Sequence, residues 1–103
     1  MVARGEVWWY EHPGAERRPF LILTRDEAIP YLNQVLGVPV TTTIRGIPTE
    51  VALDRADGMP AECVLTFDNV APIRLSLCTE RVTTLSDERM DEACKALGRA
   101  TSC

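Results

Sequence analysis

The most hydrophobic part of the chain is the run of four bulky apolar residues from Phe20 to Leu23, which has charged residues on both sides. A run this short does not form an independent helix and is typical of a strand buried on both faces. Pro19 has no backbone N–H for a strand ladder and favours an extended conformation in the preceding residue, so it predicts where this strand begins. Arg18 is therefore expected at the mouth of a rigid strand, where its guanidinium can meet an anion.

A second strand is predicted before this one, over the β-branched and aromatic segment Glu6–Tyr10. The Pro13-Gly14 pair between the two is a turn signal, so the strands are expected to form a hairpin with a long polar loop. Trp8 and Trp9 must point to opposite faces of their strand. We expect one in the core and the other exposed as a stacking or interface residue.

Later elements are also short. The sequence predicts a helical turn within residues 24–32, a strand over 35–44 bent or bulged at Gly37 and Pro39, a half-buried strand over 49–53, a strand over 63–70 and shorter strands over 73–78 and 80–84. Ser86 is expected to cap a final helix that stops at Gly98. One narrow apolar stripe on this helix would consist of Met90, Ala93, Cys94 and Leu97. These patterns predict a mainly β fold with peripheral α (α+β), a small, strongly bent sheet or barrel.

Length and composition limit the function classes. The 103 residues suit one domain, 1–103, and no apolar stretch approaches the roughly 20 residues of a membrane span or the core of a signal peptide, so the cytoplasm is expected. The net charge of −4 argues against a broad basic surface for nucleic acid. Acidic and basic residues balance up to Pro48, and the acidic surplus lies beyond it, so an anion site is expected from the first half.

Cysteines offer little chemistry in this pattern. They are far apart, lack a CxxC pair and have only His12 to complete a metal site, so we expect buried or incidental thiols and no metal or other cofactor. They are Cys63, Cys78, Cys94 and Cys103.

The remaining candidates for a functional site are arginine side chains together with hydroxyl groups. Arg18 opens one strand, and the run Thr41–Thr43 precedes Arg45 on another. If those strands adjoin, a guanidinium and one or two hydroxyls converge at one rim and could bind a phosphate. Residue types alone favour the ordinary explanation, in which the threonines are good strand sequence and Arg-Pro is a strand entrance.

The order of several blocks resembles the MazF/PemK toxin family. The blocks are residues 4–8, the Arg18-Pro19 entrance with its strand through 26, residues 38–51, residues 64–70 and the entry 84–86 into the last helix. The resemblance implies an SH3-like barrel, usually a homodimer, that cleaves single-stranded RNA at short sequences without a metal and is inhibited by a MazE-like antitoxin. It implies attack by the RNA 2′-OH, which leaves 2′,3′-cyclic phosphate and 5′-OH ends.

By the same resemblance, the catalytic residues are Arg18 and Thr41, and the supporting polar groups are Thr42 and Asn69. The segments that flank Arg18 and Thr41 contain candidates for binding splayed bases, namely Tyr10, His12 and Arg45. The alternatives are a non-enzymatic toxin similar to the CcdB gyrase poisons, which would bind its protein target through the last helix, and a dimeric scaffold that has lost activity.

Overall fold

The computed structural model describes residues 1–103 and consists of seven strands, four 3-10 turns and one helix. In chain order they are β1 (Glu6–Tyr10), β2 (Arg18–Ile22), η1 (Ile29–Tyr31), β3 (Gln34–Thr41), β4 (Glu50–Leu53), η2 (Arg55–Asp57), β5 (Cys63–Thr66), η3 (Phe67–Asn69), β6 (Ala71–Arg74), η4 (Leu75–Leu77), β7 (Cys78–Thr84) and α1 (Asp87–Thr101). The mainly β fold with a peripheral helix is confirmed. The helix is too short and too polar to cross a membrane.

All neighbouring strands are antiparallel, in the order β4-β5-β3-β2-β1-β7, and β6 pairs with β3 on the edge opposite to β2. The predicted hairpin of β1 and β2 is confirmed, with Val7 opposite Leu21. The strand buried on both faces is confirmed as well, because Leu21 packs in the main core cluster while Ile22 packs in a second, smaller one. The main cluster joins residues of β1 to β5 with the helix, so one core connects both parts of the sheet.

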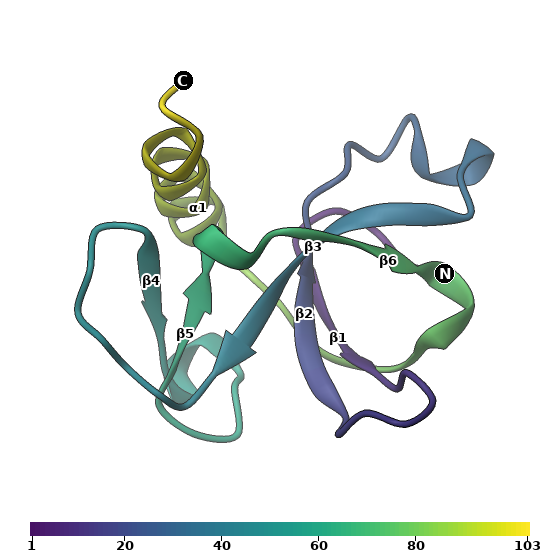
Figure 1. The fold of residues 1–103 in the computed structure, drawn as a ribbon, viewed down its shortest axis with the longest axis horizontal. Helices are drawn as coiled ribbons and strands as arrows, with labels where there is room; N and C mark the ends of the chain where they lie inside the picture. Colours follow the sequence, from purple (N-terminus) through teal and green to yellow (C-terminus); the bar gives the residue numbers. More distant parts are fainter.

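Strand β3 is bent and belongs to both parts of the sheet. Residues 34–39 pair with β2 and β6, whereas Val40 and Thr41 pair with β5. Gly37 is needed at the crowded part of the strand, since a Cβ there would lie 2.8 Å from the Ile73 side chain. The bend separates β3 from β2, and Figure 1 shows the end of β3 diverging from the start of β2.

Three predicted strands end earlier than expected. The strand predicted over 73–78 is interrupted, because β6 stops at Arg74 and the 3-10 turn η4 follows it. Strand β3 stops at Thr41 rather than residue 44, because the Thr41 hydroxyl accepts the Thr43 N–H at 3.2 Å and starts a local turn. Strand β5 stops at Thr66 rather than residue 70. Phe67 turns into the core there with only 2% of its surface exposed, and Asn69 therefore lies on the 3-10 turn η3 instead of a strand end.

The helix begins as predicted and ends later. The Ser86 hydroxyl accepts the Arg89 N–H, but the helix continues through Gly98 to Thr101 and closes at Ser102 in the left-handed conformation. The predicted apolar stripe was wrong in one member. Cys94 is exposed, whereas Ala96 is fully buried in the core together with Ala93. These small side chains face the core and let the helix approach the sheet closely.

Neither tryptophan is fully buried, so the expectation that one lies in the core was wrong. Trp8 is partly buried and packs against the second cluster. Trp9, on the opposite face, is also half-buried. Its surroundings are described below.

One ion pair ties the helix to the turn before β5. Arg89 Nε lies 2.9 Å from Asp57 Oδ1, and the Asp57 side chain is only 11% exposed. Burial raises the pKa of Asp57, but hydrogen bonds from the Arg89 side chain and the Asp54 backbone outweigh it and hold that pKa below its ordinary value of 3.8. The unfolded chain therefore binds this proton more readily, so the stabilisation is complete above pH 3.8 and is lost as the pH falls through the lower folded value.

We expect Asp57→Asn to lower the free energy of unfolding by about 1–3 kcal/mol at pH 7, because a charged hydrogen-bonded pair is broken in a mostly buried place. The mutant should also lose less stability than the wild type between pH 7 and pH 3. Urea unfolding at both pH values measures this. Glu92→Gln is the matched control: it removes the half-exposed partner of the same guanidinium and should cost less than about 1 kcal/mol. Equal effects of the two mutations would contradict the assignment.

Candidate functional site

Six polar side chains line a small hollow where β2 and β3 separate, which we call the rim hollow. Its volume is about 160 Å³, and its lining comes from the start of β2, the end of β3 with the loop that follows, the end of β5 and the turn η3. The six residues are Arg18, Thr41, Thr43, Arg45, Thr66 and Asn69. No apolar or acidic residue is among them.

The strand register explains why Arg18 and Thr41 come together. Phe20 is paired with Pro39, and continuing this antiparallel register by two residues places Arg18 opposite Thr41. The β2–β3 ladder ends at Phe20 and Pro39, before it reaches these two residues, and the end of β3 is paired with β5 alone. The two side chains therefore face a gap that is open to a ligand.

Both guanidinium groups at the rim hollow are free. The side chains of Arg18 and Arg45 make no ion pair and no hydrogen bond within the protein, whereas Arg17, Arg81 and Arg89 all pair with carboxylates. Two unpaired cations beside a hollow without a carboxylate make a local positive site in a protein of net charge −4. Guanidinium matches the oxygens of a phosphate in a bidentate manner, so this arrangement fits a phosphate group.

The hydroxyls of the hollow differ in their availability. Thr41 accepts the Thr43 N–H, and its own O–H remains able to donate to a ligand. The Thr66 hydroxyl donates to the Pro39 carbonyl at 3.1 Å, and the residue is only 8% exposed, so its contact holds β5 against β3. The sequence did not indicate Thr66, and Thr43 was named only as part of the threonine run; β5 is buried along its whole length and shows no polar–apolar alternation that could have singled out Thr66.

Glu50 fixes the loop that carries Arg45. Its Oε1 accepts the N–H groups of Arg45 and Gly46 at 3.1 and 2.9 Å. Its Oε2 is buried and has no hydrogen-bond partner. Glu50 stands opposite Thr66 in the β4–β5 ladder, so one cross-strand pair supports both the loop and the wall of the rim hollow.

Three predicted site residues lie away from the rim hollow. Thr42 does not line the rim hollow but lines two neighbouring hollows, one of which also contains Thr41. The Tyr10 hydroxyl accepts the Arg74 N–H at 3.2 Å, and its ring packs against Phe20, which gives it a structural role. His12 is exposed in the β1–β2 loop, with Nδ1 2.9 Å from the Pro13 carbonyl oxygen.

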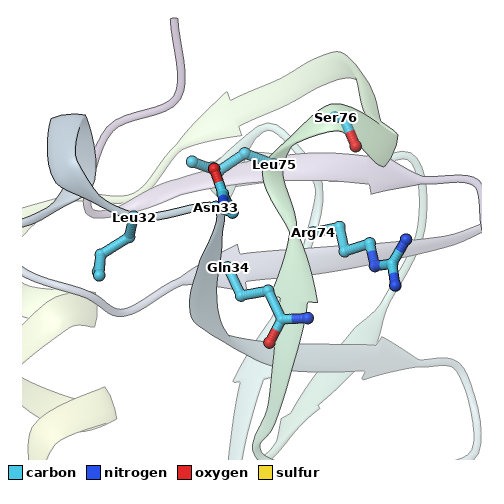
Figure 2. Close-up of a pocket in the computed structure, with 6 residues that line it drawn as sticks. All are labelled: Leu32, Asn33, Gln34, Arg74, Leu75 and Ser76. Carbon is cyan, nitrogen blue, oxygen red and sulfur yellow. The ribbon is translucent and has the colours of Figure 1, made fainter.

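A second arginine-containing hollow lies between the start of β3 and the end of β6. It encloses about 610 Å³, and Figure 2 shows Gln34 and Arg74 extending from paired strands on one side while Leu32 points away from both. It contains one cation and lacks the threonine cluster of the rim hollow. The rim hollow is therefore the better phosphate site.

No group of three or more His, Cys, Asp and Glu side chains comes together in a way that could hold a metal ion. The cysteines are all free, and their places differ: Cys63 is buried, Cys78 is half-buried, and Cys94 and Cys103 are exposed. Burial raises the pKa of the Cys63 and Cys78 thiols, which makes them poor nucleophiles.

Comparisons with known proteins agree on one family. The sequence model of the protein family described as the PemK-like, MazF-like toxin of type II toxin–antitoxin systems matches residues 3–101. The probable endoribonuclease MazF5 of Mycobacterium tuberculosis is 42% identical over 104 residues, which cover 100% of this chain and 95% of that protein.

Solved structures share the whole fold. The Mycobacterium tuberculosis toxin MazF-mt6 superposes with a TM-score of 0.86 at 30% identity, covering 94% of this chain and 96% of that one. An endoribonuclease solved in complex with its cognate antitoxin, from a mycobacterial species, gives a TM-score of 0.89 at 25% identity, covering 99% and 96%. The barrel type predicted from the sequence is therefore confirmed.

Proposed function

This chain belongs to the PemK-like, MazF-like toxin family of type II toxin–antitoxin systems and is an endoribonuclease, and we propose that it cleaves single-stranded RNA in the rim hollow. The observation that supports this place is the meeting of Arg18 and Thr41 across the open end of β2 and β3, with no carboxylate beside them. A scissile phosphate would find a free cation and a free hydroxyl donor there.

RNA carries its own nucleophile, so the site has to orient it and stabilise the charge that develops. The 2′-OH attacks the adjacent phosphorus, the bond from phosphorus to the 5′ oxygen breaks, and the products are a 2′,3′-cyclic phosphate and a 5′-OH. Arg18 stabilises the negative oxygens of the phosphorane, and Thr41 donates a hydrogen bond to them. A guanidinium does not readily release a proton, so the role of Arg18 is electrostatic. Arg45 and Asn69 bind the flanking backbone.

This chemistry makes a prediction about the substrate. An RNA with one 2′-deoxy nucleotide at the scissile position should not be cleaved there, whereas cleavage of the all-ribose RNA should continue in excess EDTA. Mapping of the 5′ ends in both reactions, with analysis of the terminal phosphate, tests both points. Cleavage of the deoxy-substituted bond, or complete inhibition by EDTA, would show that the nucleophile comes from elsewhere.

The same proposal extends to partners and location. The chain acts as a homodimer in the cytoplasm, and a MazE-like antitoxin inhibits it. An acidic segment of that antitoxin would occupy the rim hollow and pair with Arg18 and Arg45, because those guanidiniums have no partner in the toxin itself.

A further inference from the structure

A small apolar slot adjoins the rim hollow. It encloses about 120 Å³, and its lining includes Trp9 and Pro19, the core residues Val40 and Met59, and Thr42. Thr41 lines both the slot and the rim hollow. The two sites therefore meet at the residue assigned to the scissile phosphate.

The strand pairing places the slot next to Arg18. Trp9 stands opposite Pro19 in the β1–β2 ladder, and Arg18 is the residue immediately before Pro19, at the start of β2. Pro19 and Val40 lie on the pleat opposite to Arg18 and Thr41, so the slot and the rim hollow occupy the two sides of one fork. A nucleotide whose phosphate lies at Arg18 can turn its base across this fork.

Trp9 also carries a cation. The Arg17 guanidinium carbon lies 3.9 Å from the centroid of the Trp9 ring, and its contact with Glu11 is long, at 3.9 Å, and half-exposed. A cation on the ring raises the local positive potential beside the slot. The slot thus offers an aromatic wall and a nearby charge, which is the combination that single-stranded RNA sites use for a base and its phosphate.

We infer that this slot, the Trp9 slot, binds the base of a nucleotide that adjoins the scissile phosphate, and that this base is a pyrimidine. The slot is partly open and its volume of about 120 Å³ gives room for one six-membered ring against its apolar lining, so the second ring of a purine would lie outside that lining. Its lining is largely apolar, so it selects by ring size and stacking and distinguishes uracil from cytosine weakly. An apolar pocket of this kind discriminates by about 10- to 200-fold. The inference rests on the proposed function.

Cleavage mapping tests it in the full chain. A mixed RNA pool cut by the wild type should show a pyrimidine preference at one position next to the cut. Trp9→Leu should still cut but lose at least about 10-fold of that preference, while Trp9→Phe, which keeps a ring, should retain most of it. Trp8→Phe is the matched control, since Trp8 lies on the opposite face, and circular dichroism checks that each variant folds. Equal use of purines by the wild type, or an unchanged preference in Trp9→Leu, would overturn the inference.

A binding measurement separates this inference from the cleavage proposal. In Trp8→Phe protein the only tryptophan is Trp9, and its fluorescence should be quenched by all-deoxy pyrimidine oligonucleotides at concentrations at least about 10-fold lower than by deoxyadenosine oligonucleotides. Absence of cleavage together with this quenching would contradict the proposed function and leave the slot assignment standing. Equal quenching by both oligonucleotides would refute the slot assignment even if the RNA is cut.

Discussion

Arg18→Ala should reduce RNA cleavage by about 100-fold or more and should abolish growth inhibition, while the protein stays folded. The side chain is exposed and has no partner within the protein, so its removal leaves no buried group unsatisfied. What is lost is a fixed positive charge at the place where the phosphorane would form. Single-turnover cleavage of a labelled RNA, together with thermal unfolding of the variant, measures both effects.

The matched control for this mutation is Arg74→Ala, which removes an exposed arginine from the other hollow shown in Figure 2. It should leave the cleavage rate within about threefold of the wild type, because surface positions far from the site rarely matter. Arg18→Lys should fall between wild type and Arg18→Ala, since lysine keeps the charge and loses the bidentate geometry. Full growth inhibition by folded Arg18→Ala would instead favour a protein-binding toxin similar to the CcdB gyrase poisons.

Thr41→Val should slow cleavage by about 100-fold. Valine keeps the size and the branched shape of threonine, so the strand end remains in place while the donor to the phosphate disappears. The turn also loses the acceptor for the Thr43 N–H, an exposed contact that water can replace. The rate of the chemical step at saturating RNA is the measurement that separates this loss from weaker binding.

Two further variants delimit the role of the Thr41 hydroxyl. Thr41→Ser keeps the donor and should retain most of the activity. Thr84→Val makes the same chemical change at an exposed strand end far from the rim hollow and should behave as wild type. A Thr41→Val protein that cleaves at the wild-type rate would show that the hydroxyl does not contact the reacting phosphate.

The strands could be predicted where local sequence decides the structure. The β1–β2 hairpin, the doubly buried strand after Pro19 and the Ser86 cap all depend on neighbouring residues. The ends of β3 and β5 could not be predicted, because a threonine side chain and the burial of Phe67 stop those strands in ways that depend on the assembled sheet. The helix passed Gly98 for a similar reason: Ala96 and Ala100 pack against the core on both sides of it.

The candidate site was partly visible in the sequence. The approach of Arg18 to Thr41 follows from a strand register that no local pattern specifies. Composition therefore could not single out these two residues, and the family resemblance did. Tyr10 was named for its aromatic ring, but the fold uses its hydroxyl to bind the Arg74 backbone. Trp9 was only one of two tryptophans with undecided faces, and its place beside a slot became clear only from the packing of β1 on β2 and β3.

The sharing of β3 between two sets of strands has a mechanical consequence. Arg18 is carried by the strands that pair with the first part of β3, whereas Thr41 is paired with β5 beyond the bend. A small rotation about residues 39 and 40 would therefore change the distance between the guanidinium and the hydroxyl, and the hydrogen bond from Thr66 to the Pro39 carbonyl opposes it. A partner protein that bound between the two parts of the sheet could inhibit such an enzyme by changing this distance, without contacting Arg18 or Thr41.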